Sequence, residues 1–322
     1  MNQILFWAVI GAASIFLILK SASYALDSII RYARKTKLSY YFVGLLIVSL
    51  GTSLPEIFTS AIASAEGETA LVLGDAMGAT IVDITLVLAM VAIMAGSLKV
   101  KHKTVNISWW KVLAVVALPL ALALDGKLGR TDGLLMITAF LLYYGISIYS
   151  EIKKQNIVKN IPLDFTIKET VIFGFNIALL IFGVQLLVLS SSNLAKIMSV
   201  PTYIFGAVFL SICTTSPEFV IEIKALMSKS APIAFGDIFG SVICNTSLVL
   251  GIATVISPII IDKAAFYSVG LVMLSVVIVS MAFLEREIIK RWEGILLFFF
   301  YLVFLAMQIS ILMGKGIFYG II

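Results

Sequence analysis

The sequence predicts an all-α polytopic membrane protein whose ten transmembrane helices form two inverted five-helix repeats. Composition gives the class, because 61% of the residues are hydrophobic, 13% are charged and the mean hydropathy is +1.10. Soluble chains carry about 25% charged residues. The apolar residues come in blocks of about 20, the length that spans a bilayer as a helix. Lipid offers no partner to a free backbone N–H or C=O group, so these blocks must be helical.

Ten such blocks can be drawn along the chain. The longest polar stretch, 151–169, separates five of them from the other five and is expected to be a cytoplasmic linker. This divides the chain into an N-terminal repeat, 1–150, and a C-terminal repeat, 170–322. The predicted spans are 4–30, 40–64, 70–95, 105–124, 131–150, 170–192, 203–226, 232–256, 264–283 and 293–313.

One stretch of the sequence occurs twice, at 40–90 and at 202–252. The first copy contains GTSLPE at 51–56 and GDAMGATIVD at 74–83. The second copy contains CTTSPE at 213–218 and GDIFGSVICN at 236–245. Adding 162 to a residue number maps the first copy onto the second without a gap. Matches of this number at one offset indicate an internal repeat.

The positive charges set the orientation. Of the 23 lysines and arginines, 17 lie in the links after spans 1, 3, 5, 7 and 9, whereas five lie in the opposite links. The positive-inside rule therefore places the odd-numbered links in the cytoplasm and both termini outside the cell. The expected location is the plasma membrane, as a multi-pass protein. Because each half has an odd number of spans, the second half must enter the membrane inverted, as in many secondary transporters. The net charge of +5 reflects this asymmetry and does not indicate nucleic-acid binding. The bilayer is the expected partner, and no obligate protein partner is evident.

Acidic residues deep within the spans are the candidates for function, because a carboxylate at the bilayer centre is costly. Glu56, Asp83 and Glu218 are the acidic residues that we place there, and Asn245 occupies the position equivalent to Asp83. Each glutamate follows a proline, which breaks the helical hydrogen-bond ladder. Hydroxyl and carbonyl groups lie on the same helix faces as these glutamates, and they come from Ser49, Thr52, Ser53, Ser211, Thr214 and Thr215.

A set of oxygen atoms suits a hard cation such as Ca²⁺ or Na⁺. The sequence offers no thiolate or histidine pair for a soft metal, and its one histidine, His102, falls in a predicted cytoplasmic link. The structural alternative is a kinked helix whose hydroxyls bond back to the backbone. The occurrence of two copies, each followed after 27 residues by Asp or Asn, favours the cation site.

The paired motifs GTSLPE…GDAMGATIVD and CTTSPE…GDIFGSVICN resemble the two α-repeats of the cation/calcium exchanger superfamily, and most of all those of prokaryotic sodium/calcium exchangers. The resemblance implies an antiporter, not an enzyme, that exports Ca²⁺ against inward Na⁺. Both ions are substrates, and no cofactor is expected. The resemblance makes Glu56 and Glu218 ligands shared by both ions, with Asp83 and Asn245 flanking them. It also makes Thr52, Ser53, Thr214, Thr215 and Ser241 hydroxyl ligands, and Ser49 and Ser211 backbone ligands.

The sequence departs from this family pattern at several positions. Archaeal relatives commonly carry Asn in the first repeat and Asp in the second, the reverse of Asp83 and Asn245. Ala79 replaces a serine, which removes one hydroxyl. Asp75 and Asp237 stand where the family usually has Asn, and each could attract cations in a vestibule or be a hydrogen-bonded residue near the first helical turn.

Three other functions compete with sodium-coupled exchange. A proton-coupled calcium exchanger of the same superfamily would typically have Glu at both central positions, which here hold Asp83 and Asn245. An intramembrane aspartyl protease could use Asp75 and Asp237, but it would leave both Pro-Glu motifs unexplained and normally shows Gly-x-Gly-Asp. A cation channel is the third alternative, and the inverted repeat favours alternating access over a pore.

Overall fold

The computed structural model describes residues 2–36, 39–99, 109–154, 163–198, 205–228, 230–286 and 288–312. Six long helices are α1 (Asn2–Thr36), α7 (Trp109–Leu122), α8 (Arg130–Lys154), α9 (Leu163–Met198), α15 (Lys263–Glu285) and α16 (Arg291–Leu312). The remaining helices of the first half are α2 (Tyr40–Val43), η1 (Gly44–Val48), α3 (Ser49–Thr52), α4 (Leu54–Ala65), α5 (Thr69–Val82), η2 (Asp83–Val87), α6 (Leu88–Ala95) and η3 (Ala123–Asp125). Those of the second half are η4 (Phe205–Leu210), α11 (Ser211–Thr214), α12 (Ser216–Met227), α13 (Ala231–Ile243), η5 (Cys244–Val249) and α14 (Leu250–Ile256).

Among the described residues, seven helices are long and apolar enough to cross a membrane. An eighth span is formed if the pair Gly206–Thr214 and Ser216–Met227, bent by 48°, counts as one. The other two predicted spans, 105–124 and 170–192, fall on α7, described from Trp109 onward, and on α9. The helical membrane fold is therefore confirmed, and the number of ten spans stays a prediction. Residues 151–154 and 163–169 of the predicted linker continue α8 and α9, and its centre lies outside the described residues.

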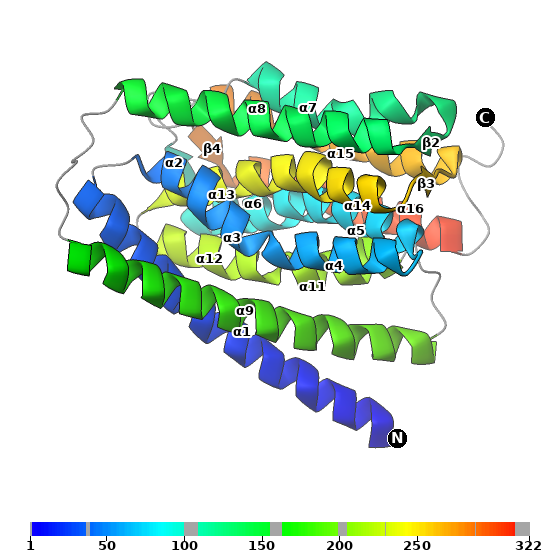
Figure 1. The fold of residues 1–322 in the computed structure, drawn as a ribbon, viewed down its shortest axis with the longest axis horizontal. Helices are drawn as coiled ribbons and strands as arrows, with labels where there is room; N and C mark the ends of the chain where they lie inside the picture. Colours follow the sequence, from blue (N-terminus) through cyan, green and yellow to red (C-terminus); the bar gives the residue numbers. More distant parts are fainter. Residues whose placement is uncertain are drawn as a thin grey trace.

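The backbone repeats its irregular features at the same offset of 162. The segments η1, η2, η4 and η5 are π-helical, and they end at Val48, Val87, Leu210 and Val249. Figure 1 shows that the chain runs from left to right through α3 and α4 but from right to left through α11 and α12. Related elements of the two halves therefore point in opposite directions across the molecule.

Two short antiparallel ladders connect the halves. Strand β1 (Ser97–Lys99) pairs with β4 (Ile288–Lys290), and β2 (Lys127–Leu128) pairs with β3 (Ile259–Ile260). Each ladder joins one strand of the first half to one strand of the second. The two ladders are related to each other by the same offset, since Ser97 corresponds to Ile259 and Leu128 to Lys290.

Glycines let the central helices approach closely. A Cβ atom added to Gly44 would lie 2.2 Å from the carbonyl oxygen of Ile233, and one added to Gly206 would lie 2.5 Å from that of Leu71. Side chains at these positions would force the backbones apart, as in small-residue packing between membrane helices. Helix α13 consequently packs on α2, η1 and α3, while α5 packs on η4 and α11. In the core of the fold, helices of each repeat therefore pack directly against helices of the other repeat.

Helices α1 and α9 pack along each other outside this core, as the lower pair in Figure 1. Arg31 of α1 and Glu169 of α9 form an ion pair at 2.9 Å, and the Ser28 hydroxyl donates a hydrogen bond to the same carboxylate at 2.8 Å. Large apolar side chains such as Phe16 and Phe175 remain exposed on these helices. Exposed apolar side chains on the outside of the helix bundle fit contact with lipid.

Candidate cation site

Breaks in two spans place the glutamates of the repeated motifs. Helix α3 ends at Thr52 and α4 begins at Leu54, so Ser53 lies between them with ψ of 1°. In the second half, Thr215 lies between α11 and α12 with ψ of −2°. A proline in the first turn of each following helix removes an N–H group that would have no helical partner there. Glu56 and Glu218 thus sit in the first turn of a half-helix, where the backbone dipole favours negative charge.

Asp83 and Asn245 are placed by a second kind of irregularity. Asp83 begins the π-helical segment η2, and Asn245 is the second residue of η5. Such segments widen one turn of a helix and are frequent at functional sites. The sequence contains no signal that would have predicted them.

All of the predicted site residues are buried. None is more than 2% exposed, and the set comprises Glu56, Glu218, Asp83, Asn245, Thr52, Ser53, Thr214, Thr215, Ser49, Ser211 and Ser241.

The acidic and amide oxygens of this set lack partners. Both carboxylate oxygens of Asp83, one each of Glu56 and Glu218, and the amide oxygen of Asn245 accept no hydrogen bond. No ion pair among the described residues involves them. Buried carboxylates without partners are strongly unfavourable, so protons or cations must compensate their charge. The unpartnered oxygens are of the type that could hold a cation.

The threonines of the two motifs join the halves. The Thr52 hydroxyl lies 3.3 Å from Oδ1 of Asp237, and the Thr214 hydroxyl lies 3.2 Å from Oδ1 of Asp75. These two contacts are equivalent under the offset of 162. Each threonine hydroxyl is also within bonding distance of carbonyls one turn earlier in its own helix. Each hydroxyl has one proton, which the carboxylate and the carbonyls share, and its lone pairs stay available to a cation.

The backbone carbonyls of Ser49 and Ser211, which the resemblance makes ion ligands, already accept hydrogen bonds within the protein. The Ser49 carbonyl accepts hydrogen bonds from the Ser53 amide at 2.9 Å and the Thr52 hydroxyl at 3.2 Å. The Ser211 carbonyl is engaged in the same way by Thr215 and Thr214, at 3.0 and 3.3 Å. These two carbonyls are therefore less available to an ion than the carboxylates are.

The structure brings Ser53 and Ser241 together, with 3.5 Å between their hydroxyl oxygens. Thr215 has no hydrogen-bond partner for its hydroxyl. The hydroxyls of Ser53, Ser241 and Thr215 are all buried. Among the described residues, no group of three acidic, histidine or cysteine side chains lies close enough to hold a metal ion. An ion bound here would have to combine carboxylates with hydroxyl, amide or water oxygens.

Asp75 and Asp237 are hydrogen-bonded, as one of the two interpretations from the sequence held, but they do not lie in the first helical turn. Each is the seventh residue of its helix, α5 or α13, and therefore lies beyond the first turn. Each is at most 1% exposed, so neither lies in an open vestibule in this structure. Instead, each carboxylate is held by a threonine of the opposite repeat.

Two further residues were missed by sequence reasoning. Glu222 of α12 is fully buried, and neither of its carboxylate oxygens has a partner. Its signal was available, since it lies four residues after Glu218 on the same helix. Tyr144 of α8 donates a hydrogen bond to the Leu45 carbonyl at 2.9 Å and lies 3.1 Å from the Ser49 hydroxyl. Nothing in the repeated motifs could have indicated that contact. His102 lies outside the described residues.

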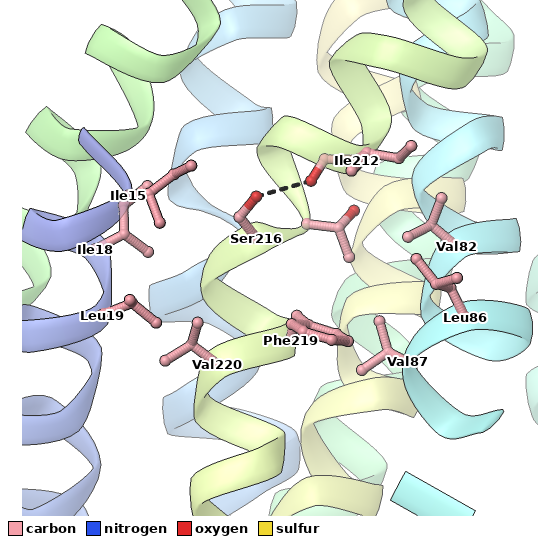
Figure 2. Close-up of a pocket in the computed structure, with 11 residues that line it drawn as sticks. Ile15, Ile18, Leu19, Val82, Leu86, Val87, Ile212, Ser216, Phe219 and Val220 are labelled. Carbon is pink, nitrogen blue, oxygen red and sulfur yellow. Dashed lines mark hydrogen bonds between the residues drawn. The ribbon is translucent and has the colours of Figure 1, made fainter. Parts of the chain in front are cut away.

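An apolar cavity of about 290 Å³ lies beside the site. Figure 2 shows Ile18 and Leu19 of α1 facing Phe219 and Val220 of α12 across it, with Val87 of η2 on the far side. The hydroxyl of Ser216 lies at the upper edge and donates to the carbonyl of Ile212 at 2.8 Å. The lining offers almost no oxygen atoms, so this cavity is not the cation site.

Comparison with known proteins identifies the family. The family described as "Sodium/calcium exchanger protein" matches residues 6–149 and 168–310, which together make up most of the chain and take in both copies of the motif. The chain belongs to the sodium/calcium exchanger family. The fold agrees, because a structure of the sodium-calcium exchanger NCX_Mj soaked with Na⁺ and Sr²⁺ aligns with a TM-score of 0.78 and 21% identity. That alignment covers 94% of this chain and 99% of NCX_Mj.

Curated relatives point to the same family. The sodium/calcium exchanger MaX1 of Methanosarcina acetivorans is 23% identical, over 91% of this chain and 95% of MaX1. The inner membrane protein YrbG of Escherichia coli is 28% identical, over 82% of this chain and 85% of YrbG. The resemblance found in the motifs is thereby confirmed, as is the expectation of a multi-pass membrane protein. Exchangers are transporters, so the family is not one of enzymes.

Proposed function

We propose that this member of the sodium/calcium exchanger family exports Ca²⁺ in exchange for inward Na⁺, by alternating access to one site near the middle of the membrane. The observation that carries the proposal is the set of fully buried carboxylate oxygens without partners on Glu56, Asp83 and Glu218. Such a set requires positive charge, and a protein that carried no ion would gain nothing from keeping it in a membrane.

In this proposal Glu56 and Glu218 are ligands of both transported ions, Ca²⁺ and Na⁺. Asp83 adds a carboxylate on one side and Asn245 an amide oxygen on the other. Hydroxyl oxygens come from Thr52, Thr214, Ser53, Thr215 and Ser241, and backbone oxygens of Ser49 and Ser211 complete the set. Only oxygen atoms are involved, which suits Na⁺ and Ca²⁺ and disfavours softer metals.

Alternating access needs two arrangements of comparable energy. The inverted pair of five-helix repeats, 1–150 and 170–322, supports this, because exchanging the conformations of the halves would turn an outward-open form into an inward-open one. We propose that the odd-numbered links face the cytoplasm of a cell whose plasma membrane holds the protein, and that both termini lie outside. The bias of lysine and arginine supports this orientation.

The main alternative function is a proton-coupled calcium exchanger, which differs from this proposal in the ion that drives transport. In purified proteoliposomes, an outward Na⁺ gradient should drive uptake of radioactive Ca²⁺, whereas an outward H⁺ gradient of equal size should not. Empty liposomes with the same gradients are the control. Uptake driven by H⁺ alone would identify a proton-coupled exchanger, and uptake that needs neither gradient would indicate a channel.

A further inference from the structure

Glu222 is a buried acidic residue that has no role in the proposed central site. The residue is 0% exposed, and both of its oxygens lack partners. Its equivalent in the first repeat, 162 residues earlier, is Ser60, which is also buried. The fold therefore accommodates a small neutral side chain at this position. A buried carboxyl group here is unfavourable and packing does not require it, so its charge must be compensated by a proton or by a cation.

The surroundings of Glu222 point to the nature of that compensation. Helix α12, which carries Glu222, packs against α13 and against η2, and these two elements also contact each other. Each supplies one buried carboxylate, Asp237 from α13 and Asp83 from η2. Oδ2 of Asp237 also lacks a partner.

The repeat-related location is built differently. The counterparts of Glu222, Asp237 and Asp83 are Ser60, Asp75 and Asn245. One location thus has three acidic side chains and its counterpart only one. Because α4 and α12 run in opposite directions, the two locations lie toward opposite ends of the molecule (Figure 1). The buried acidic side chains are therefore distributed unequally between the two ends of the molecule.

We propose that Glu222 and Asp237 form a second cation site, one helical turn from Glu218 toward the connection between α12 and α13. Its ligand is a partly hydrated divalent cation such as Ca²⁺, because two carboxylates balance two positive charges and water completes the shell of oxygens. Asp83, which belongs to the central site, is carried by η2, an element that packs against both α12 and α13. The proposal rests on the proposed function for the identity of the ion, and on the burial and missing partners of Glu222 for the existence of the site.

A second site on one side has a consequence for transport. The second site would bind Ca²⁺ near the connection between α12 and α13, which is the cytoplasmic side in the proposed orientation. An exporter gains from such a site, since a second carboxylate pair raises the local concentration of the scarce ion. Replacing Glu222 should therefore weaken the apparent Ca²⁺ affinity from that side only.

The test is equilibrium binding of radioactive Ca²⁺ to the purified protein in Na⁺-free buffer. Wild type should show two classes of site, and Glu222→Gln should lose one of them. Glu222→Asp, which keeps the charge, should retain both, and Ser60→Ala is the matched control at the equivalent position and should also retain both. Glu222→Ser places the first repeat's own residue at the site, so it gives a second reading if the glutamine variant is unstable.

A sided flux measurement completes the experiment. In inside-out vesicles Glu222→Gln should raise the Ca²⁺ concentration for half-maximal Na⁺-driven flux roughly tenfold, and in right-side-out vesicles it should leave that concentration unchanged. If Glu222→Gln and Glu222→Ser both bind Ca²⁺ like wild type, the second site does not exist, although the proposed function stands. If wild-type protein binds no Ca²⁺, the proposed function fails, and this inference fails with it.

Discussion

At the scale of single residues, the two halves of the central site differ in charge. Asp83 and Asn245 occupy equivalent positions in η2 and η5, and both have buried oxygens without partners. Asp83→Asn should weaken Na⁺ binding more than Ca²⁺ binding, because several monovalent ions need more compensating charge than one divalent ion. The double change Asp83→Asn with Asn245→Asp should recover much of the Na⁺-driven Ca²⁺ flux. A double variant as inactive as Asp83→Asn alone would show that the two positions are not equivalent.

At the scale of the elements, the contact between α13 and η1 depends on a glycine. Gly44→Ala would place a methyl group 2.2 Å from the Ile233 carbonyl oxygen, so it should destabilise the protein by about 1–3 kcal/mol. Gly145→Ala is the matched control, since nothing lies within 4 Å of its added Cβ. Thermal unfolding in detergent should show a lower midpoint for the first variant only. Equal midpoints would mean that the helices can separate at no cost.

The pair of outer helices offers a prediction about pH. The Arg31 guanidinium lowers the pKa of the Glu169 carboxyl by hydrogen bonding, and the Ser28 hydroxyl adds to the effect. The stabilisation is therefore present above the pKa of an unfolded glutamate, about 4.3, and is lost as the pH falls through the lower pKa of the folded state. Because Arg31 is 46% exposed, the pair should contribute only about 1 kcal/mol.

Glu169→Gln should consequently lower the unfolding midpoint at pH 7 but not at a pH below the folded-state pKa. Glu66→Gln, at an exposed position, is the control for removal of a surface carboxylate. The measurement is the difference in midpoint between each variant and wild type across pH. A difference for Glu169→Gln that stays constant into acid would show that the ion pair is not its source.

At the scale of the whole molecule, transport should be electrogenic. The proposed site exchanges Ca²⁺ for several Na⁺, and the resemblance to sodium/calcium exchangers implies that more positive charge moves in than out. An inside-negative potential, set with K⁺ and valinomycin in proteoliposomes, should therefore speed the half-reaction that carries net positive charge inward. Flux that is unaffected by the sign of an imposed potential would contradict electrogenic exchange.

Much of this architecture could be predicted from the sequence. The composition and the repeated motifs led to a helical membrane protein of the exchanger type, and the burial of Glu56, Asp83 and Glu218 follows the prediction. These features are encoded locally, by apolar runs and by Pro-Glu pairs. The ten spans, the orientation and the ligand assignments stay predictions.

Other features depend on contacts across the fold and could not be read locally. The hydrogen bonds of Thr52 to Asp237 and of Thr214 to Asp75 join residues far apart in the chain. The hydroxyl of Tyr144 reaches Leu45 from a different helix. Glu222 is different, because its position one turn after Glu218 is visible in the sequence, but its counterpart in the first repeat is Ser60, so the symmetry of the motifs does not indicate it.

The central claim is that Glu56 and Glu218 bind the exchanged ions. The most direct test measures Na⁺-driven Ca²⁺ uptake in proteoliposomes that contain wild type, Glu56→Gln or Glu218→Gln, with Glu66→Gln as control and reconstituted amounts matched. Each central variant keeps the size of the side chain but removes a charge that both ions need. We expect uptake by Glu56→Gln and Glu218→Gln to fall to the level of empty liposomes, while Glu66→Gln matches wild type. Near-normal uptake by either central variant in correctly folded form would contradict the account.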